Sequence, residues 1–146
     1  MPTWAAPAGG SLPAAKVTNI TTGQALSQTV LTKVTWNSEL YDTASNFASN
    51  RFTATTAGYY AVTSSQSFDS AGGADIYYSI HKNGSEYQII YFGTSSLNYP
   101  QANIDTMVYL NVSDYVEVFI QYYNGGGART LNLGNTCWFA ITGIRS

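Results

Sequence analysis

The feature that most constrains the fold of this chain is a run of alternating side chains at residues 59–68. One set of alternate positions holds Tyr60, Val62, Ser64, Gln66 and Phe68, and the other holds Tyr59, Ala61, Thr63, Ser65 and Ser67. A period of two residues is the spacing of a pleated strand. The aromatic and β-branched residues of its first half are suited to packing against a facing sheet. We expect this strand in the middle of a sheet, after a short strand at 51–54 and a turn at 55–58.

Several further segments have strand character, and no stretch has a helical pattern. Strands are predicted at residues 16–20, 30–37, 74–82, 86–93, 101–111, 114–123 and 136–144. Asn83-Gly84 is a strong hairpin signal, because both residues tolerate the left-handed conformation of a type I′ turn. A second hairpin is predicted around Val112-Ser113, and residues 38–50 are interpreted as a long loop. Eight to ten short antiparallel strands predict an all-β sandwich or jelly roll.

Phe52, Gly58 and Tyr60 have a characteristic spacing, with five residues between the first two and one between the last two. This spacing resembles the signature of the C1q/TNF-like jelly roll, and residues 34–37, 83–84, 108–118 and 138–143 follow in the order of that family. Val62 stands where the family prefers Phe, and Ser64 where it prefers an aromatic residue. The resemblance covers residue 16 to the C-terminus. It implies a C1q/TNF-like jelly roll that associates as a compact trimer around an axis lined by aromatic and aliphatic side chains.

The composition gives an independent reason to expect self-association. Only 10% of the 146 residues are charged, whereas Tyr occurs 12 times. An ordinary soluble domain has charges at about a quarter of its positions. A weakly charged, aromatic surface tends to associate, so copies of the chain are expected to cover part of it. The homotrimer axis is predicted on the Tyr60 face or the 114–123 strand, with an interface that contains Tyr60, Tyr115, Tyr122 and Tyr123.

No residue pattern indicates catalysis. His81 is the only histidine, and no Gly-x-Ser-x-Gly nucleophile motif occurs. His81 is therefore interpreted as a surface or interface residue near a turn. Cys137, the single cysteine, is interpreted as a buried small hydrophobic residue. The chain is predicted not to be an enzyme.

No metal site or other cofactor is predicted either. Asp69 and Asp75 flank a glycine-rich turn that is interpreted as a solvated loop, with the calcium site of some C1q-like domains as the alternative. The net charge is −2 and the Lys and Arg residues are scattered, which argues against nucleic-acid binding. No apolar run approaches the length of a membrane-spanning helix, so membrane insertion is not expected.

Residues 1–15 are predicted to form an extended arm, and residues 16–146 the jelly-roll domain. Prolines at positions 2, 7 and 13 are incompatible with a helix or a central strand. The arm is either a disordered tail or an anchor whose Trp4 enters a pocket on another subunit. The anchoring residues in the second interpretation are Pro2, Trp4, Pro7 and Leu12.

The resemblance, together with the Ser, Thr, Asn and Tyr content and the absence of a secretory signal, implies a bacteriophage virion component. The function expected is that of a trimeric capsid decoration (cement) protein, which its arm anchors to the major capsid protein or another virion protein. The alternative is a tail-fibre tip that binds a host-surface glycan through loops containing Tyr99, Gly126 and Arg129. A secreted ligand of the eukaryotic family is a third possibility, which the missing signal disfavours. The expected location is the virion, after synthesis in the host cytoplasm.

Overall fold

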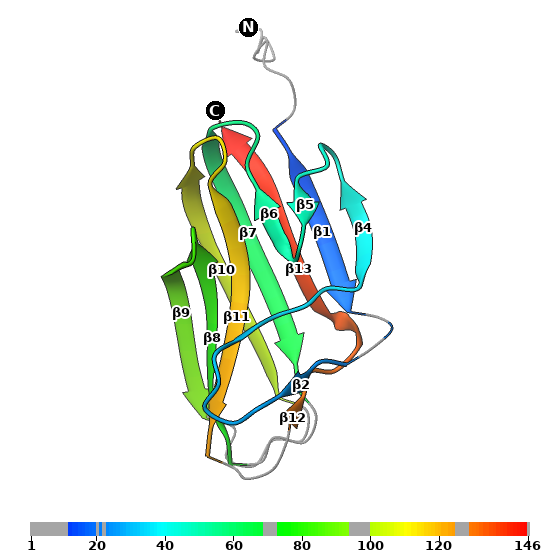
Figure 1. The fold of residues 1–146 in the computed structure, drawn as a ribbon, viewed down its shortest axis with the longest axis vertical. Helices are drawn as coiled ribbons and strands as arrows, with labels where there is room; N and C mark the ends of the chain where they lie inside the picture. The colour runs from blue at the N-terminus through cyan, green and yellow to red at the C-terminus, as the bar shows by residue number, and fades with distance from the viewer. Residues whose placement is uncertain are drawn as a thin grey trace, which may run out of the picture.

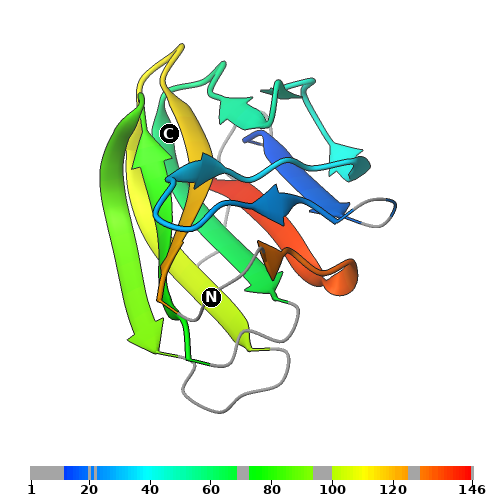
Figure 2. The ribbon, with the colours of Figure 1, turned by 60° about the horizontal axis from the view of Figure 1, so that its bottom comes forward.

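The computed structural model describes residues 12–19, 21, 23–68, 73–93, 100–124 and 129–145. These residues form two antiparallel sheets that face each other across a core, and a small third sheet (Figures 1 and 2). Eight strands have five or more residues: β1 (Ala14–Asn19), β4 (Ser38–Asp42), β7 (Gly58–Ser67), β8 (Asp75–Lys82), β9 (Ser85–Gly93), β10 (Gln101–Leu110), β11 (Tyr115–Tyr123) and β13 (Gly134–Arg145). The short strands are β2 (Ala25–Leu26), β3 (Thr32–Lys33), β5 (Phe47–Ala48), β6 (Arg51–Thr53) and β12 (Arg129–Thr130).

The first sheet has five strands in the order β10-β7-β13-β1-β4. β7 pairs on both sides, with β10 from Gly58↔Leu110 to Ser67↔Gln101 and with β13 through pairs such as Ser65↔Trp138. The predicted long strand in the interior of a sheet is therefore confirmed. β10 and β4 are the edge strands of this sheet.

The second sheet has six strands, with β5-β6-β11-β8-β9 along its main path and β3 paired with β11. β8 and β9 form the predicted hairpin at Asn83-Gly84, and both turn residues have positive φ, 51° and 78°. The two residues satisfy the demand of a type I′ turn for left-handed conformations at both central positions. β2 and β12 make the small third sheet.

The core lies between the two large sheets. It contains the side chains of the Tyr60 side of β7, which the two-residue alternation places together. Tyr60, Val62 and Phe68 are almost fully buried, as are Ile80 and Ile120 on the facing sheet. This arrangement confirms an all-β antiparallel sandwich. None of the described residues forms a helix long and apolar enough to cross a membrane.

A buried hydroxyl pair joins the sheets at the position where the resembling family prefers an aromatic residue. Ser64 Oγ lies 2.5 Å from the Tyr78 hydroxyl oxygen, and Ser64 also donates to the Trp138 carbonyl. Burial raises the pKa of the Tyr78 phenol, which therefore stays protonated and available as a hydrogen-bond donor. Buried polar groups need hydrogen-bond partners, and the Ser64 hydroxyl is the partner of the buried Tyr78 hydroxyl. The small side chain of Ser64 also leaves room for the Tyr78 ring from the facing sheet.

Three predictions of local structure are wrong. The Val112-Ser113 turn does not make a hairpin, because β10 pairs with β7 in one sheet and β11 pairs with β8 in the other. Residues 38–50 are not a loop throughout, since they contain β4 and β5. In the strand predicted at 30–37, only β3 is regular, although Val34 is fully buried.

The domain begins earlier than residue 16. β1 starts at Ala14, and the Pro13 carbonyl accepts a hydrogen bond of 3.0 Å from the Gly143 amide. The Leu12 side chain lies directly over Gly143, where a Cβ atom would collide with it. Leu12, which the sequence assigns to the arm, is therefore half-buried against β13 as part of the sandwich.

Candidate functional site

The outward side of β7, β10 and β13 in the five-stranded sheet carries a group of exposed apolar side chains. Tyr59, Met107, Tyr109 and Ile144 are 49%, 57%, 43% and 53% exposed. We call this surface the open face, and define it by these four residues together with Ala61 and Thr142. Exposed apolar patches of this kind on soluble domains mark interaction surfaces.

Strand register places five residues of the open face side by side, and Ile144 lies in the bulge of β13 between Gly143 and Arg145. Tyr59 pairs with Tyr109, and Ala61 pairs with Met107 on one side and Thr142 on the other. The rings of Tyr59 and Tyr109 meet edge to face, with centroids 5.1 Å apart. Since side chains alternate across a strand, the same alternation that buries Tyr60 and Val108 exposes Tyr59 and Tyr109.

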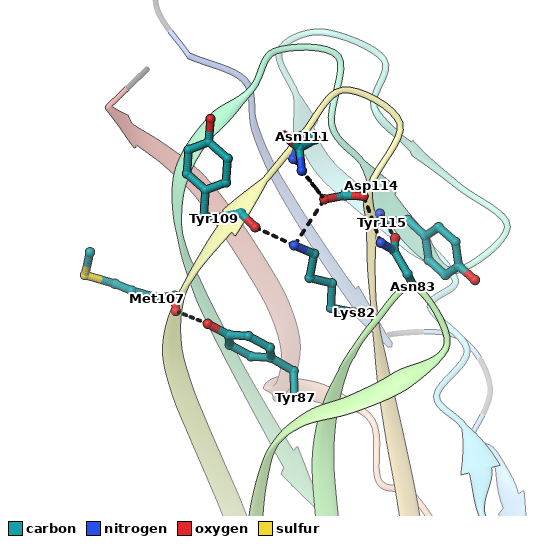
Figure 3. Close-up of polar contacts among 8 residues, drawn as sticks. All are labelled: Lys82, Asn83, Tyr87, Met107, Tyr109, Asn111, Asp114 and Tyr115. Carbon is teal, nitrogen blue, oxygen red and sulfur yellow. Dashed lines mark hydrogen bonds and ion pairs between the residues drawn. The ribbon is translucent and has the colours of Figure 1, made fainter.

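Two side chains from the other sheet hold the edge strand that carries Met107 and Tyr109 (Figure 3). The Lys82 ammonium donates to the Tyr109 carbonyl at 2.7 Å, and the Tyr87 hydroxyl donates to the Met107 carbonyl at 3.0 Å. An edge strand otherwise presents unpaired backbone groups, which invite pairing with another chain. These two bonds fix the backbone of β10 and leave the Met107 and Tyr109 side chains free for contacts on the open face.

Asp114 organises the polar contacts around Lys82, and we call Lys82, Asn83, Asn111 and Asp114 the polar brace (Figure 3). The Asp114 carboxylate accepts bonds from the Asn111 amide at 2.9 Å and the Asn83 side-chain amide at 2.8 Å, and lies 3.1 Å from the Lys82 ammonium. These bonds, with that of Asn111 contributing most, lower the pKa of Asp114 from 3.8 to about 2. The brace therefore joins the β8–β9 hairpin to the β10–β11 turn.

The structure is similar to solved structures of TNF-family jelly-roll proteins. The crystal structure of murine APRIL superposes with a TM-score of 0.63 at 14% sequence identity, over 90% of this chain and 98% of that one. The structure of Eiger TNF from S. frugiperda gives a TM-score of 0.68 at 12% identity, over 92% of this chain and 94% of that one. This chain has a TNF-like jelly-roll fold. No family model and no curated protein matches its sequence.

The TNF-like sandwich contradicts part of the predicted trimer interface. Tyr60 and Tyr122 are 0% and 2% exposed and point into the core, so the prediction that they contact another subunit is wrong. Tyr115 and Tyr123 are half-buried on the outward side of the six-stranded sheet, away from the open face. The aromatic surface that β7 does offer is that of Tyr59.

Several other predicted site residues lie outside the described residues, namely Pro2, Trp4, Pro7, Tyr99 and Gly126. Arg129 is described, half-buried in β12, where it pairs with Leu26. Of the three predicted ligand-loop residues, the structure therefore describes only Arg129, and the glycan loop stays a prediction.

The only histidine and the only cysteine of the chain, its most reactive side chains, are both buried. His81 is 6% exposed, stacks on Phe119 at a centroid distance of 4.3 Å and has Nε2 3.1 Å from Ser79 Oγ, so its interpretation as a surface residue is wrong. Cys137 is fully buried, as predicted. Across the described ranges, no three His, Cys, Asp or Glu residues gather in a position to hold a metal ion.

The open face could have been found from the sequence of β10. Its inward positions hold Ile104, Val108 and Leu110, so Met107 and Tyr109 occupy the outward side, where a solvated strand carries polar residues. Apolar residues on both sides of one edge strand are the signal of a second buried face. The contacts of the polar brace carry no comparable signal, because Asn83 and Asp114 are far apart in sequence.

Proposed function

We propose that this chain is a non-enzymatic structural protein that assembles as a homotrimer through the open face. The observation that carries the proposal is the cluster of Tyr59, Met107, Tyr109 and Ile144, four large side chains left exposed on one sheet. Burial of such side chains between copies is favourable by about 25 cal/mol for each Å² removed from water. The TNF-like fold and the resemblance to C1q/TNF-like trimers favour three copies over two.

The trimer is further proposed to decorate a bacteriophage capsid, where the N-terminal arm binds the major capsid protein or another virion protein. The arm enters the sandwich at Leu12, next to Gly143 and one strand position from the open-face residues Thr142 and Ile144. In a trimer built on the open face, all three arms would therefore leave near the axis, at the same end. Such an arrangement lets three arms engage neighbouring subunits of a shell and raises their combined affinity.

The oligomeric state provides the first test. Size-exclusion chromatography with light scattering should give three times the subunit mass of 15.8 kDa at micromolar concentration. A monomer under these conditions would rule out the homotrimer. A measured mass of one subunit would also contradict the proposed role of the open face as a contact between copies.

Deletion of the arm provides the second test. The deletion should remove residues 1–11 only, because Leu12 and Pro13 contact β13 and β1 starts at Ala14. The shortened chain should remain trimeric and should lose its occupancy on phage particles that lack their own decoration protein. Equal occupancy of the shortened and full chains, quantified by cryo-electron microscopy, would remove the anchor role of the arm.

A further inference from the structure

A row of three tyrosines lies on the outward side of the six-stranded sheet, and we call Tyr77, Tyr91 and Tyr123 the tyrosine ladder. The ring centroids of Tyr77 and Tyr91 are 4.7 Å apart, and those of Tyr77 and Tyr123 are 5.2 Å apart. Tyr91 is 57% exposed. The neighbours Ile76 and Tyr78 point into the core, so the ladder faces away from it and away from the open face.

A fixed carboxylate lies at the end of the ladder. The Asn124 side-chain amide donates to Asp75 Oδ2 at 2.7 Å. The other oxygen of Asp75, Oδ1, is near Gly93, the residue paired with Asp75 on β9, where a Cβ atom would be 3.3 Å away. Because Gly93 has no side chain, nothing from that position covers the carboxylate. Partial desolvation, the charge of Asp75 and a hydrogen bond between the Tyr91 hydroxyl and the Asp75 side chain raise the pKa of the Tyr91 phenol, so the hydroxyl stays protonated and helps to fix the carboxylate.

From this arrangement we infer a binding site for a neutral glycan on the tyrosine ladder, with Asp75 and Asn124 as its polar contacts. A sugar ring has an apolar side of C–H groups, which can lie on an aromatic ring, and hydroxyls, which need fixed acceptors and donors. The ladder offers both within one surface, with an apolar body and a polar tip on each Tyr. Binding sites of this kind combine aromatic walls with a few polar groups that set orientation.

The charge of the site selects among possible ligands. Of the five residues that form the proposed site, only Asp75 carries a formal charge. A sialylated or otherwise acidic glycan would bring a second negative charge next to it, at a Coulomb cost. Nucleic-acid bases also stack on aromatic rings, but they bring phosphates that such a surface does not neutralise. Neutral sugars avoid both penalties.

This inference does not depend on the decoration role. The ladder and the open face lie on opposite sheets, so a trimer built on the open face leaves the ladder exposed. Glycan binding and particle occupancy can therefore fail separately. A trimer that decorates particles without binding sugar would contradict only the present inference.

The test begins with the full chain on a printed array of neutral and acidic bacterial polysaccharides and oligosaccharides, followed by calorimetric titration with the best neutral oligosaccharide. Tyr91→Ala should weaken binding roughly two- to tenfold, the value of one aromatic contact, whereas Tyr91→Phe should retain the stacking. Asp75→Asn should weaken binding while the ladder stays intact. Tyr41→Ala is the matched control, because Tyr41 is a 44% exposed tyrosine on β4, in the other sheet and outside the ladder.

Binding that Tyr91→Ala and Asp75→Asn both reduce and Tyr41→Ala leaves unchanged would support the site. Periodate, which cleaves the vicinal diols of the printed sugars, should abolish the signal. The site is overturned if no neutral glycan binds, if only acidic glycans bind, or if Tyr91→Ala binds as well as the original chain. Retention on deglycosylated carrier protein would show that the ladder binds protein and would overturn it equally.

Discussion

The two outward faces of the sandwich cover their aromatic side chains in different ways. On the six-stranded sheet, His81 stacks on Phe119, and the Arg51 guanidinium lies 4.5 Å from the centre of the Tyr115 ring. Beside them, the Lys33 ammonium pairs with Glu117 at 2.5 Å. We call His81, Phe119, Tyr115, Glu117 and their partners Lys33 and Arg51 the covered strip. On the open face, by contrast, the described aromatic neighbours of Tyr59 and Tyr109 are each other, and both rings remain exposed.

This difference shows that the covered strip, unlike the open face, needs no other molecule to bury its side chains. The covered strip brings its own cations and rings from distant segments, so that even His81 and Glu117 are less than 10% exposed within one chain. The open face leaves Met107 and Ile144 more than half exposed. A substitution on the covered strip should therefore act on the stability of the subunit, and one on the open face should act on association.

The largest effect is expected on the open face, from Met107→Glu. Packing an unpaired carboxylate into a subunit contact costs about 3–5 kcal/mol. The proposed trimer should dissociate, as measured by light scattering, while the thermal unfolding of the subunit changes little. Val112→Glu, at a 60% exposed position in the β10–β11 turn, is the matched control and should remain trimeric. If the Met107 variant also remains trimeric, the open face is not the interface.

The next effect is expected on the covered strip, from Glu117→Gln. Loss of a charged hydrogen bond at a buried site should lower the free energy of unfolding by about 1–3 kcal/mol, without changing the number of subunits. Urea unfolding measures this loss. Glu39→Gln, at an exposed position on β4, is the control and should stay within about 0.5 kcal/mol of the original chain. Equal stability of the two variants would show that the Lys33–Glu117 pair contributes nothing measurable.

A smaller effect is expected from acid acting on the polar brace. The pKa of Asp114 is lower in the folded chain, about 2, than its ordinary value of 3.8. A depressed pKa stabilises the folded state above the unfolded pKa, and this contribution is lost as the pH falls from about 4 to about 2. Asp114→Asn should flatten the stability profile in that window. An unchanged acid profile in the Asn variant would contradict the role of Asp114.

The smallest effect is expected where the brace region meets the open face, from Tyr87→Phe. The change removes the hydroxyl that donates to the Met107 carbonyl and should cost about 0.5 kcal/mol, the low end for an exposed hydrogen bond. Differential scanning calorimetry against Tyr41→Phe, an exposed tyrosine on β4, would resolve it. Identical melting of the two variants would mean that Lys82 alone holds this edge.

Local signals predicted the parts of the fold in which neighbours in sequence are neighbours in space. The alternation at 59–68 predicted β7, and Asn83-Gly84 predicted the β8–β9 hairpin, because both depend on the conformations of adjacent residues. The hairpin predicted at Val112-Ser113 was wrong because this signal, too, depends only on the conformation of adjacent residues. Ser113 does have a positive φ of 74°, yet its flanking strands join different sheets.

The inward side of β7 could not be assigned from the sequence because both sides of the strand begin with tyrosine. The two-residue period of a strand requires that Tyr59 and Tyr60 point in opposite directions. It does not decide which of them points inward. The packing of Tyr60 on Phe52, at a centroid distance of 5.5 Å, decides this. The polar brace was not predicted either, since the Asn83–Asp114 contact spans 31 positions along the chain.

The amino-acid sequence by itself determined that this protein is built of strands, where its longest strand lies, and that its many tyrosines and few charges favour contact with other molecules. Only the tertiary structure decided which tyrosines are free to make that contact. The reason is that a strand's own pattern fixes its two sides, whereas the side that is covered depends on a facing sheet assembled from distant parts of the chain.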